Sequence, residues 1–61
     1  MVSLGVMIKR IAGLQDTRDV TAWENGFIGK MIARTNNGAY TSTLFPKEVE
    51  KIEEIHDKHF A

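Results

Sequence analysis

Apolar residues recur at intervals of three and four positions in three separate segments, and this spacing limits the folds open to the chain. An α-helix turns about 100° per residue, so residues three and four apart share one face. The spacing predicts helices at about residues 3–14, 20–34 and 46–59. The expected fold class is therefore all-α, a small three-helix domain.

Local signals mark the ends of the first two predicted helices. Gly13 is placed to end the first one in the usual manner of a C-terminal glycine. Thr21 followed by Glu24 is a capping-box pattern, in which each side chain pairs with a backbone N–H of the other residue. Asp16 and Asp19 are alternative caps about one turn earlier. The second helix is therefore expected to begin between residues 20 and 22.

Residues 35–43 form the predicted loop before the third helix. Asn36, Asn37 and Gly38 are typical of a turn that contains a left-handed residue. Pro46 suits the first position of the following helix, and Glu48 stands where a capping box has its acid. The cap position itself holds Phe45, which is either a local defect or an aromatic residue displayed for another purpose.

One core shared by the three helices defines a single domain over residues 1–61. The candidate core residues are Leu4, Ile8, Ile11, Trp23, Phe27, Met31, Val49, Ile52 and Ile55. A chain of this length buries only about 60% of its unfolded surface, and such domains usually need a further staple. Because the sequence has no cysteine, disulfides are excluded, and a homodimer is the expected staple.

Charge and hydropathy narrow the function classes. Eight basic residues balance eight acidic ones, so no bulk attraction to nucleic acid or to an anionic membrane is expected. The longest apolar run is too short to cross a bilayer, and the order of charged and apolar residues does not suit a signal peptide. We therefore expect a cytoplasmic protein with no membrane association.

The reactive side chains form no recognisable catalytic pattern. There is no cysteine, no serine motif and no phosphate-binding glycine loop, so we expect neither an enzyme nor a cofactor. Glu53, His56 and His59 follow a spacing known from metal-binding helix bundles. On a helical wheel Glu53 lies about 120° from His59, so the three do not converge on one ion. No metal site is predicted.

Two surfaces remain for a protein partner, and a sector of the second helix is unusual in composition, either a tolerated weak helix or a groove. The third helix carries an acidic face, which suits a basic site, and the first helix has a second apolar side at Val2 and Val6. The acidic face consists of Glu50, Glu53, Glu54 and Asp57. The second helix has a sector of small residues that would allow the close approach of another helix, in this chain or in a second copy. This sector consists of Ala22, Gly26, Gly29 and Ala33.

Two other functions stay open at this point. Lys9, Arg10, Lys30 and Arg34 would serve a small regulator that binds nucleic acid, although no helix-turn-helix is present. A structural or assembly subunit is the other alternative.

Residues 19–60 resemble small uncharacterised proteins of bacteriophage genomes. The resemblance rests on Trp23-Glu24-Asn25-Gly26-Phe27, followed by Leu44-Phe45-Pro46-Lys47-Glu48 and a helix that ends in Lys58-His59-Phe60. The chain departs from that pattern at Phe45, where serine or threonine is usual, and at Glu48, where glutamine is usual. The resemblance implies a phage or prophage setting, in which small proteins bind and inhibit host proteins in the host cytoplasm. The expected function is therefore a non-enzymatic module that binds a host or phage protein.

Overall fold

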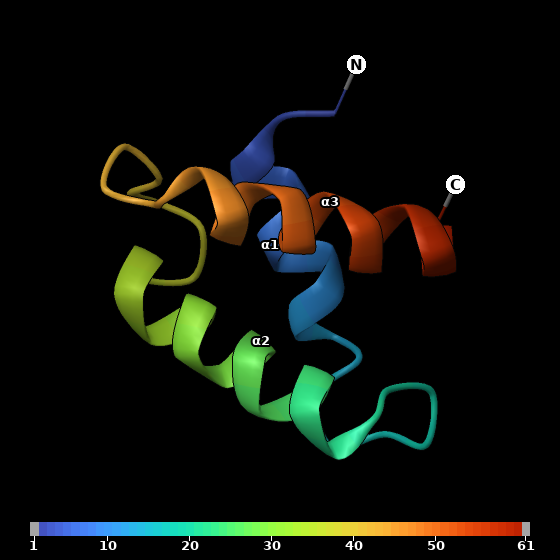
Figure 1. Cartoon of the computed structure of the whole chain (residues 1–61). Coiled ribbons are helices and arrows are strands. Elements are labelled where there is room, and N and C mark those ends of the chain that lie inside the picture. Colours follow the sequence, from blue (N-terminus) through green and yellow to red (C-terminus); the bar gives the residue numbers. More distant parts are fainter. Residues whose placement is uncertain (1, 61) are drawn as a thin grey trace.

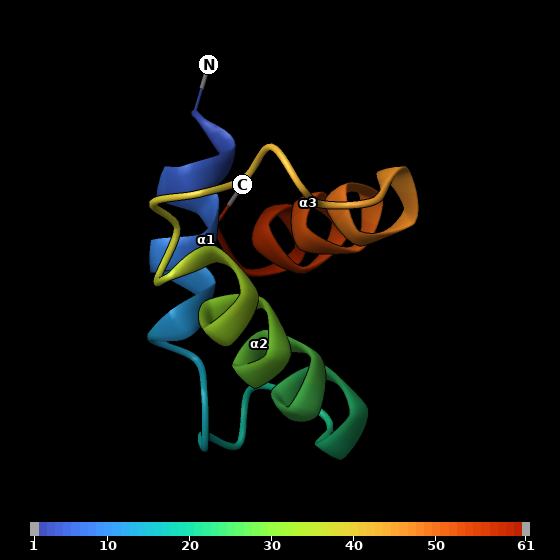
Figure 2. The same cartoon turned by 90° about the vertical axis from the view of Figure 1, so that its left-hand side faces the viewer.

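Three helices form the whole regular structure of the residues described by this computed structural model, which are residues 2–60. They are α1 (Leu4–Ala12), α2 (Ala22–Thr35) and α3 (Pro46–Phe60). α2 and α3 cross: they run in opposite directions across Figure 1 but both run from right to left in Figure 2, and α1 lies behind them in Figure 1. The predicted all-α, three-helix fold is confirmed.

α1 is the element against which the other two helices pack. It contacts both α2 and α3, whereas α2 and α3 contact each other much less. Figure 2 shows α2 and α3 diverging from α1. Each helix supplies two aliphatic side chains, spaced three apart, to the fully buried core. These residues are Ile8, Ile11, Ile28, Met31, Ile52 and Ile55.

The rotation of α2 differs from the predicted one. Trp23, a predicted core residue, is 60% exposed, and Ile28 takes its place in the core. The buried stripe of α2 runs through Ile28, Met31 and Thr35. The Thr35 hydroxyl donates to the carbonyl of Met31 and accepts from the N–H of Gly38, so its burial leaves no unpaired hydroxyl.

Three other predicted core residues lie at the edge of the core. Leu4 and Phe27 are partly buried and pack against the core, and Val49 is half-buried. α2 carries apolar residues on two adjoining sides, and of the three residues predicted for its core stripe only Met31 is fully buried.

The helix ends follow from local hydrogen bonds. α1 stops at Ala12 because the next N–H groups bond three residues back, from Gly13 to Arg10 and from Leu14 to Ile11. Gly13 caps the end of α1, as expected, but its φ of −68° is right-handed and not the left-handed conformation usual for a glycine at this position. α2 begins at Ala22 behind the complete capping box of Thr21.

The turn after α2 is left-handed, as predicted. Asn36, Asn37 and Gly38 all have positive φ. The N–H of Asn37 bonds to the carbonyl of Ile32, and that of Tyr40 bonds to the carbonyl of Thr35. These bonds satisfy carbonyls at the end of α2 and turn the chain back toward α1.

Gly5 and Gly38 bring two backbone segments into direct contact. A Cβ atom on Gly5 would lie 2.6 Å from the carbonyl oxygen of Gly38, and a Cβ on Gly38 would lie 2.6 Å from that of Gly5. Gly26, by contrast, has nothing within 4 Å of its would-be Cβ. The glycines therefore have different roles: two permit packing, and Gly26 leaves a surface open.

Alanine substitutions distinguish these roles. Gly26→Ala is expected to raise the free energy of unfolding by about 0.5–1 kcal/mol, because it improves helix propensity without a clash. Gly5→Ala and Gly38→Ala are expected to lower it, because both obstructing atoms are backbone atoms. Urea denaturation followed by circular dichroism measures all three. A Gly5→Ala variant as stable as Gly26→Ala would contradict the close contact.

Candidate functional site

The aromatic side chains lie outside the fully buried core. Trp23 is 60% exposed, Tyr40 66%, Phe45 63% and Phe60 43%, and Phe27 is partly buried. The sequence contains no other aromatic residue of these types. A chain of this size would ordinarily use such side chains to enlarge its core, since each buries a large apolar area.

Trp23 and Phe27 form the wall of a hollow on α2. Their rings stack with centroids 5.3 Å apart and planes 8° from parallel. The hollow has a volume of about 340 Å³ and is completed by Ala22, Gly26 and Lys30. Because Gly26 has no side chain, the hollow is open down to the backbone of the helix.

A lysine of α3 reaches across to this site. The Lys51 ammonium lies 5.2 Å from the centroid of the Trp23 ring, within the range of a cation–π contact. The same ammonium donates to both carboxylate oxygens of Glu54, at 3.1 Å each. The Trp23 side chain is therefore oriented by Phe27 along its own helix and by Lys51 from the next.

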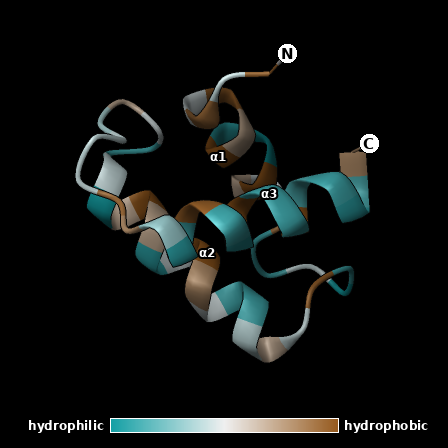
Figure 3. Cartoon of the chain, turned by 45° about the horizontal axis from the view of Figure 1, so that its top comes forward, coloured by the Kyte–Doolittle hydropathy of each residue, from teal (hydrophilic) through white to brown (hydrophobic). Residues whose placement is uncertain are grey.

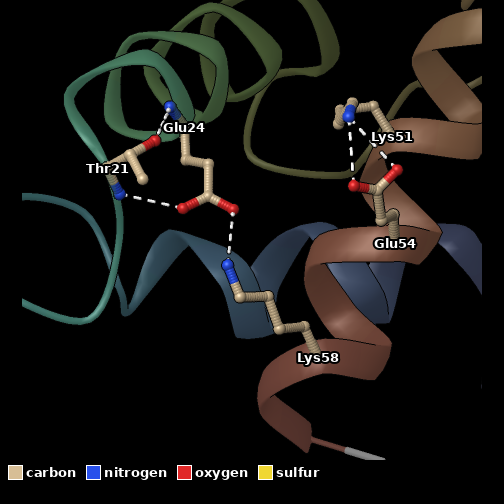
Figure 4. A network of polar contacts seen from close by, with 5 residues as sticks. All are labelled: Thr21, Glu24, Lys51, Glu54 and Lys58. Carbon is tan, nitrogen blue, oxygen red and sulfur yellow. Dashed lines mark hydrogen bonds and ion pairs between the residues drawn. The ribbon is translucent and has the colours of Figure 1, made fainter.

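Figure 4 shows the polar network beside the first turn of α2. The N–H of Thr21 donates to the Glu24 carboxylate at 2.8 Å, and the N–H of Glu24 donates to the Thr21 hydroxyl at 3.1 Å. The ammonium of Lys58 lies 3.4 Å from the other oxygen of Glu24 and links α3 to this end of α2. The bond from the Thr21 N–H is the main cause that lowers the pKa of Glu24, and Lys58 lowers it further, against the opposing effect of burial.

A second network joins the end of α2 to the start of α3. Arg34 forms an ion pair with Glu48 and donates to the carbonyl of Thr43, and its guanidinium lies 5.4 Å from the centre of the Phe45 ring. Glu48 accepts from the N–H of Phe45, which is the backbone half of the predicted capping box. This bond is the main cause that lowers the pKa of Glu48, and Arg34 and Lys30 lower it further, again against the effect of burial.

The predicted acidic face lies on α3, and none of its four residues lines the hollow. Glu50, Glu53, Glu54 and Asp57 are all exposed. Much of α3 is correspondingly hydrophilic in Figure 3. Glu54 is paired with Lys51, and Asp57 is hydrogen-bonded to His56. On the other predicted surface Val6 is exposed, whereas Val2 is half-buried.

The four predicted basic residues have different surroundings. Lys9 and Arg10 are on α1, and Lys30 and Arg34 are on α2. Arg34 is neutralised by Glu48, and Arg10 donates to His56. Lys30 lines the hollow, where it is the only ionisable group among the lining residues.

His56 is buried and hydrogen-bonded rather than directed at solvent. Its Nε2 lies 3.2 Å from the Arg10 guanidinium, and its Nδ1 lies 3.2 Å from the Asp57 carboxylate. Because arginine can only donate, Nε2 accepts and the proton is on Nδ1. The Nε2 of His59 is buried without a hydrogen-bond partner in residues 2–60. Within the same range, no three or more histidine and carboxylate side chains are grouped to hold a metal ion.

The sequence interpretation missed the hollow because it assigned Trp23 to the core. The signal that identifies it is the combination of two stacked aromatic residues with small residues one position away, at Ala22 and Gly26. Of the predicted small-residue sector, Gly29 instead faces the side chain of Gln15, whose Nε2 is 2.9 Å from the would-be Cβ.

Comparison of the chain with protein-family models, curated proteins and solved structures gave no match. Within residues 2–60 no helix combines the length and the apolar character that crossing a bilayer requires.

Removal of the Thr21 hydroxyl tests the capping box beside the hollow. Thr21→Ala is expected to lower the free energy of unfolding by about 0.5–2 kcal/mol, because the N–H of Glu24 loses its acceptor. Thr21→Ser keeps the hydroxyl and is expected to stay close to the parent chain. Thermal denaturation of both variants measures the effect, and equal losses would argue against the cap.

The two carboxylates with lowered pKa make stability depend on pH. Each favours the folded state when ionised, so its contribution is complete at neutral pH and is lost as the pH falls through the folded-state pKa. Glu24→Gln and Glu48→Gln are expected to be less stable than the parent chain at pH 7, with the difference shrinking in acid. Urea titrations across the acid range measure this. A difference that stays constant with pH would contradict the assignment.

Proposed function

We propose that this chain is a non-enzymatic protein-binding module whose main contact surface is the hollow around Trp23 and Phe27. The observation that carries the proposal is the exclusion of the aromatic residues from the fully buried core, with four of them exposed. Tryptophan and tyrosine dominate the binding energy of protein interfaces, because they bury a large area with few rotatable bonds.

The surroundings of the hollow support binding by a preformed surface. Trp23 is stacked on Phe27 and covered by Lys51, so little side-chain freedom is left to lose when a partner binds. Glu24 with Lys58 and Arg34 with Glu48 tie both ends of α2 to α3 or its preceding loop. The single ionisable group in the lining, Lys30, also favours binding over acid–base catalysis.

The setting that we propose is the one implied by the phage resemblance. The partner is then a host or phage protein, and the module acts in the host cytoplasm as a modulator or inhibitor. The acidic face of α3 is a second contact surface in this proposal, and self-association into a homodimer is part of it. Binding to nucleic acid through the basic residues is the less favoured alternative, because Arg10 and Arg34 have partners within the chain.

Affinity capture from a bacterial lysate tests the proposal. The parent chain is expected to retain a partner that Trp23→Ala loses, because the aromatic wall of the hollow is removed. Trp23 is exposed and outside the core, so this variant is expected to keep the helical circular dichroism of the parent chain.

Tyr40→Ala is the matched control, because Tyr40 is equally exposed but does not line the hollow. It is expected to retain the partner. Charge reversal at Glu50 and Glu53 measures the contribution of the acidic face. A partner retained equally by the parent chain and by Trp23→Ala would refute the hollow as the main contact surface.

A further inference from the structure

The geometry points to one class of occupant for the hollow on α2: an amphipathic helical segment of another protein, with an apolar anchor flanked by acidic side chains. This inference rests on the proposed function and specifies the partner's chemistry. It is carried by the shape of the hollow and by the charges around it.

The shape suits the backbone of a helix with one inserted apolar side chain. Ala22 and Gly26 lie one turn apart and add almost no side-chain bulk, and nothing stands within 4 Å above Gly26. Small residues at such a spacing let a second helix approach closely. The stacked rings of Trp23 and Phe27 then provide an apolar wall along one side of the approaching helix.

The charges at the rim are complementary to carboxylates. Lys30 lines the hollow and forms no ion pair within residues 2–60. Lys51 lies over Trp23 and forms an ion pair with Glu54, whose side chain is largely exposed. The nearby acids Glu24 and Glu48 are already paired, with Lys58 and Arg34.

The lining of the hollow contains one charged group, Lys30. No carboxylate belongs to its lining. An acidic residue beside the apolar anchor therefore meets Lys30 with no carboxylate in the lining to compete for it, whereas at Lys51 it competes with the exposed carboxylate of Glu54.

A second copy of this chain is a poorer occupant than a separate protein. The acidic face of α3 is accompanied by one exposed apolar side chain, Phe60, which already stacks on His56 of its own chain at 5.5 Å.

Three model peptides test the inference in the full chain. Each is an amphipathic helix with leucines along one face, and the flanking positions carry glutamate, glutamine or lysine. Trp23 is the only tryptophan, so its fluorescence reports occupation of the hollow directly. We expect the glutamate peptide to shift the Trp23 emission to shorter wavelength. We expect the chain to bind the lysine peptide about fivefold or more weakly than the glutamate peptide.

Variants of the chain locate the binding and its charge dependence. Gly26→Leu fills the hollow and is expected to weaken the glutamate peptide at least about tenfold, since the close approach is lost. Lys30→Glu is expected to weaken the same peptide about fivefold. Lys47→Glu makes the same charge change at an exposed position of α3 outside the lining, and is expected to leave affinity unchanged.

The outcomes separate the inference from the proposed function. If the lysine peptide binds as well as the glutamate peptide does, the partner is not acidic and this inference is overturned. If Gly26→Leu weakens that binding, the hollow is still a protein-binding site and the proposed function stands. If Gly26→Leu binds the glutamate peptide as tightly as the parent chain does, the hollow is not the binding site. A fluorescence shift that appears with chain concentration alone, together with dimers in light scattering, would show a second copy as the occupant and overturn the separate partner.

Discussion

The packing of two helices against α1 is the interaction on which the rest of the molecule depends. Ile8 and Ile11 lie on this short helix and face α2 and α3, which each return two aliphatic side chains. Within residues 2–60 these six are the fully buried apolar residues, and seven partly buried ones pack around them. The close contact between Gly5 and Gly38 extends the same packing to backbone atoms, where no side chain can be accommodated.

Polar contacts hold α2 and α3 in register where apolar packing between them is sparse. Glu24 with Lys58 joins the start of α2 to the end of α3, and Arg34 with Glu48 joins the end of α2 to the start of α3. Exposed ion pairs usually contribute little, but both glutamates here are also bound by a backbone N–H at a helix start. One carboxylate thus caps a helix and links two elements, so helix formation and tertiary packing reinforce each other.

The divergence of α2 from α3 has a direct consequence for the surface. A face of α2 that a more compact bundle would cover is left with Trp23 and Phe27 beside the bare backbone of Gly26. A small domain gives up stability when it leaves large aromatic side chains in water. The proposed recognition of a partner would supply a physical reason for that arrangement, since burial of these rings would then be completed on binding.

Local patterns in the sequence were sufficient to predict the three helices, the Thr21–Glu24 capping box, the left-handed turn at residues 36–38 and the acid at the start of α3. Each depends on interactions between residues within four or five positions, which the sequence displays directly. The sequence did not determine which side of α2 faces α1, because both Trp23 with Phe27 and Ile28 with Met31 are apolar pairs at helical spacing. Only the tertiary structure decided between them, since the rotation of a helix depends on how three surfaces fit together at once, and that choice exposed Trp23 and left Phe27 at the edge of the core.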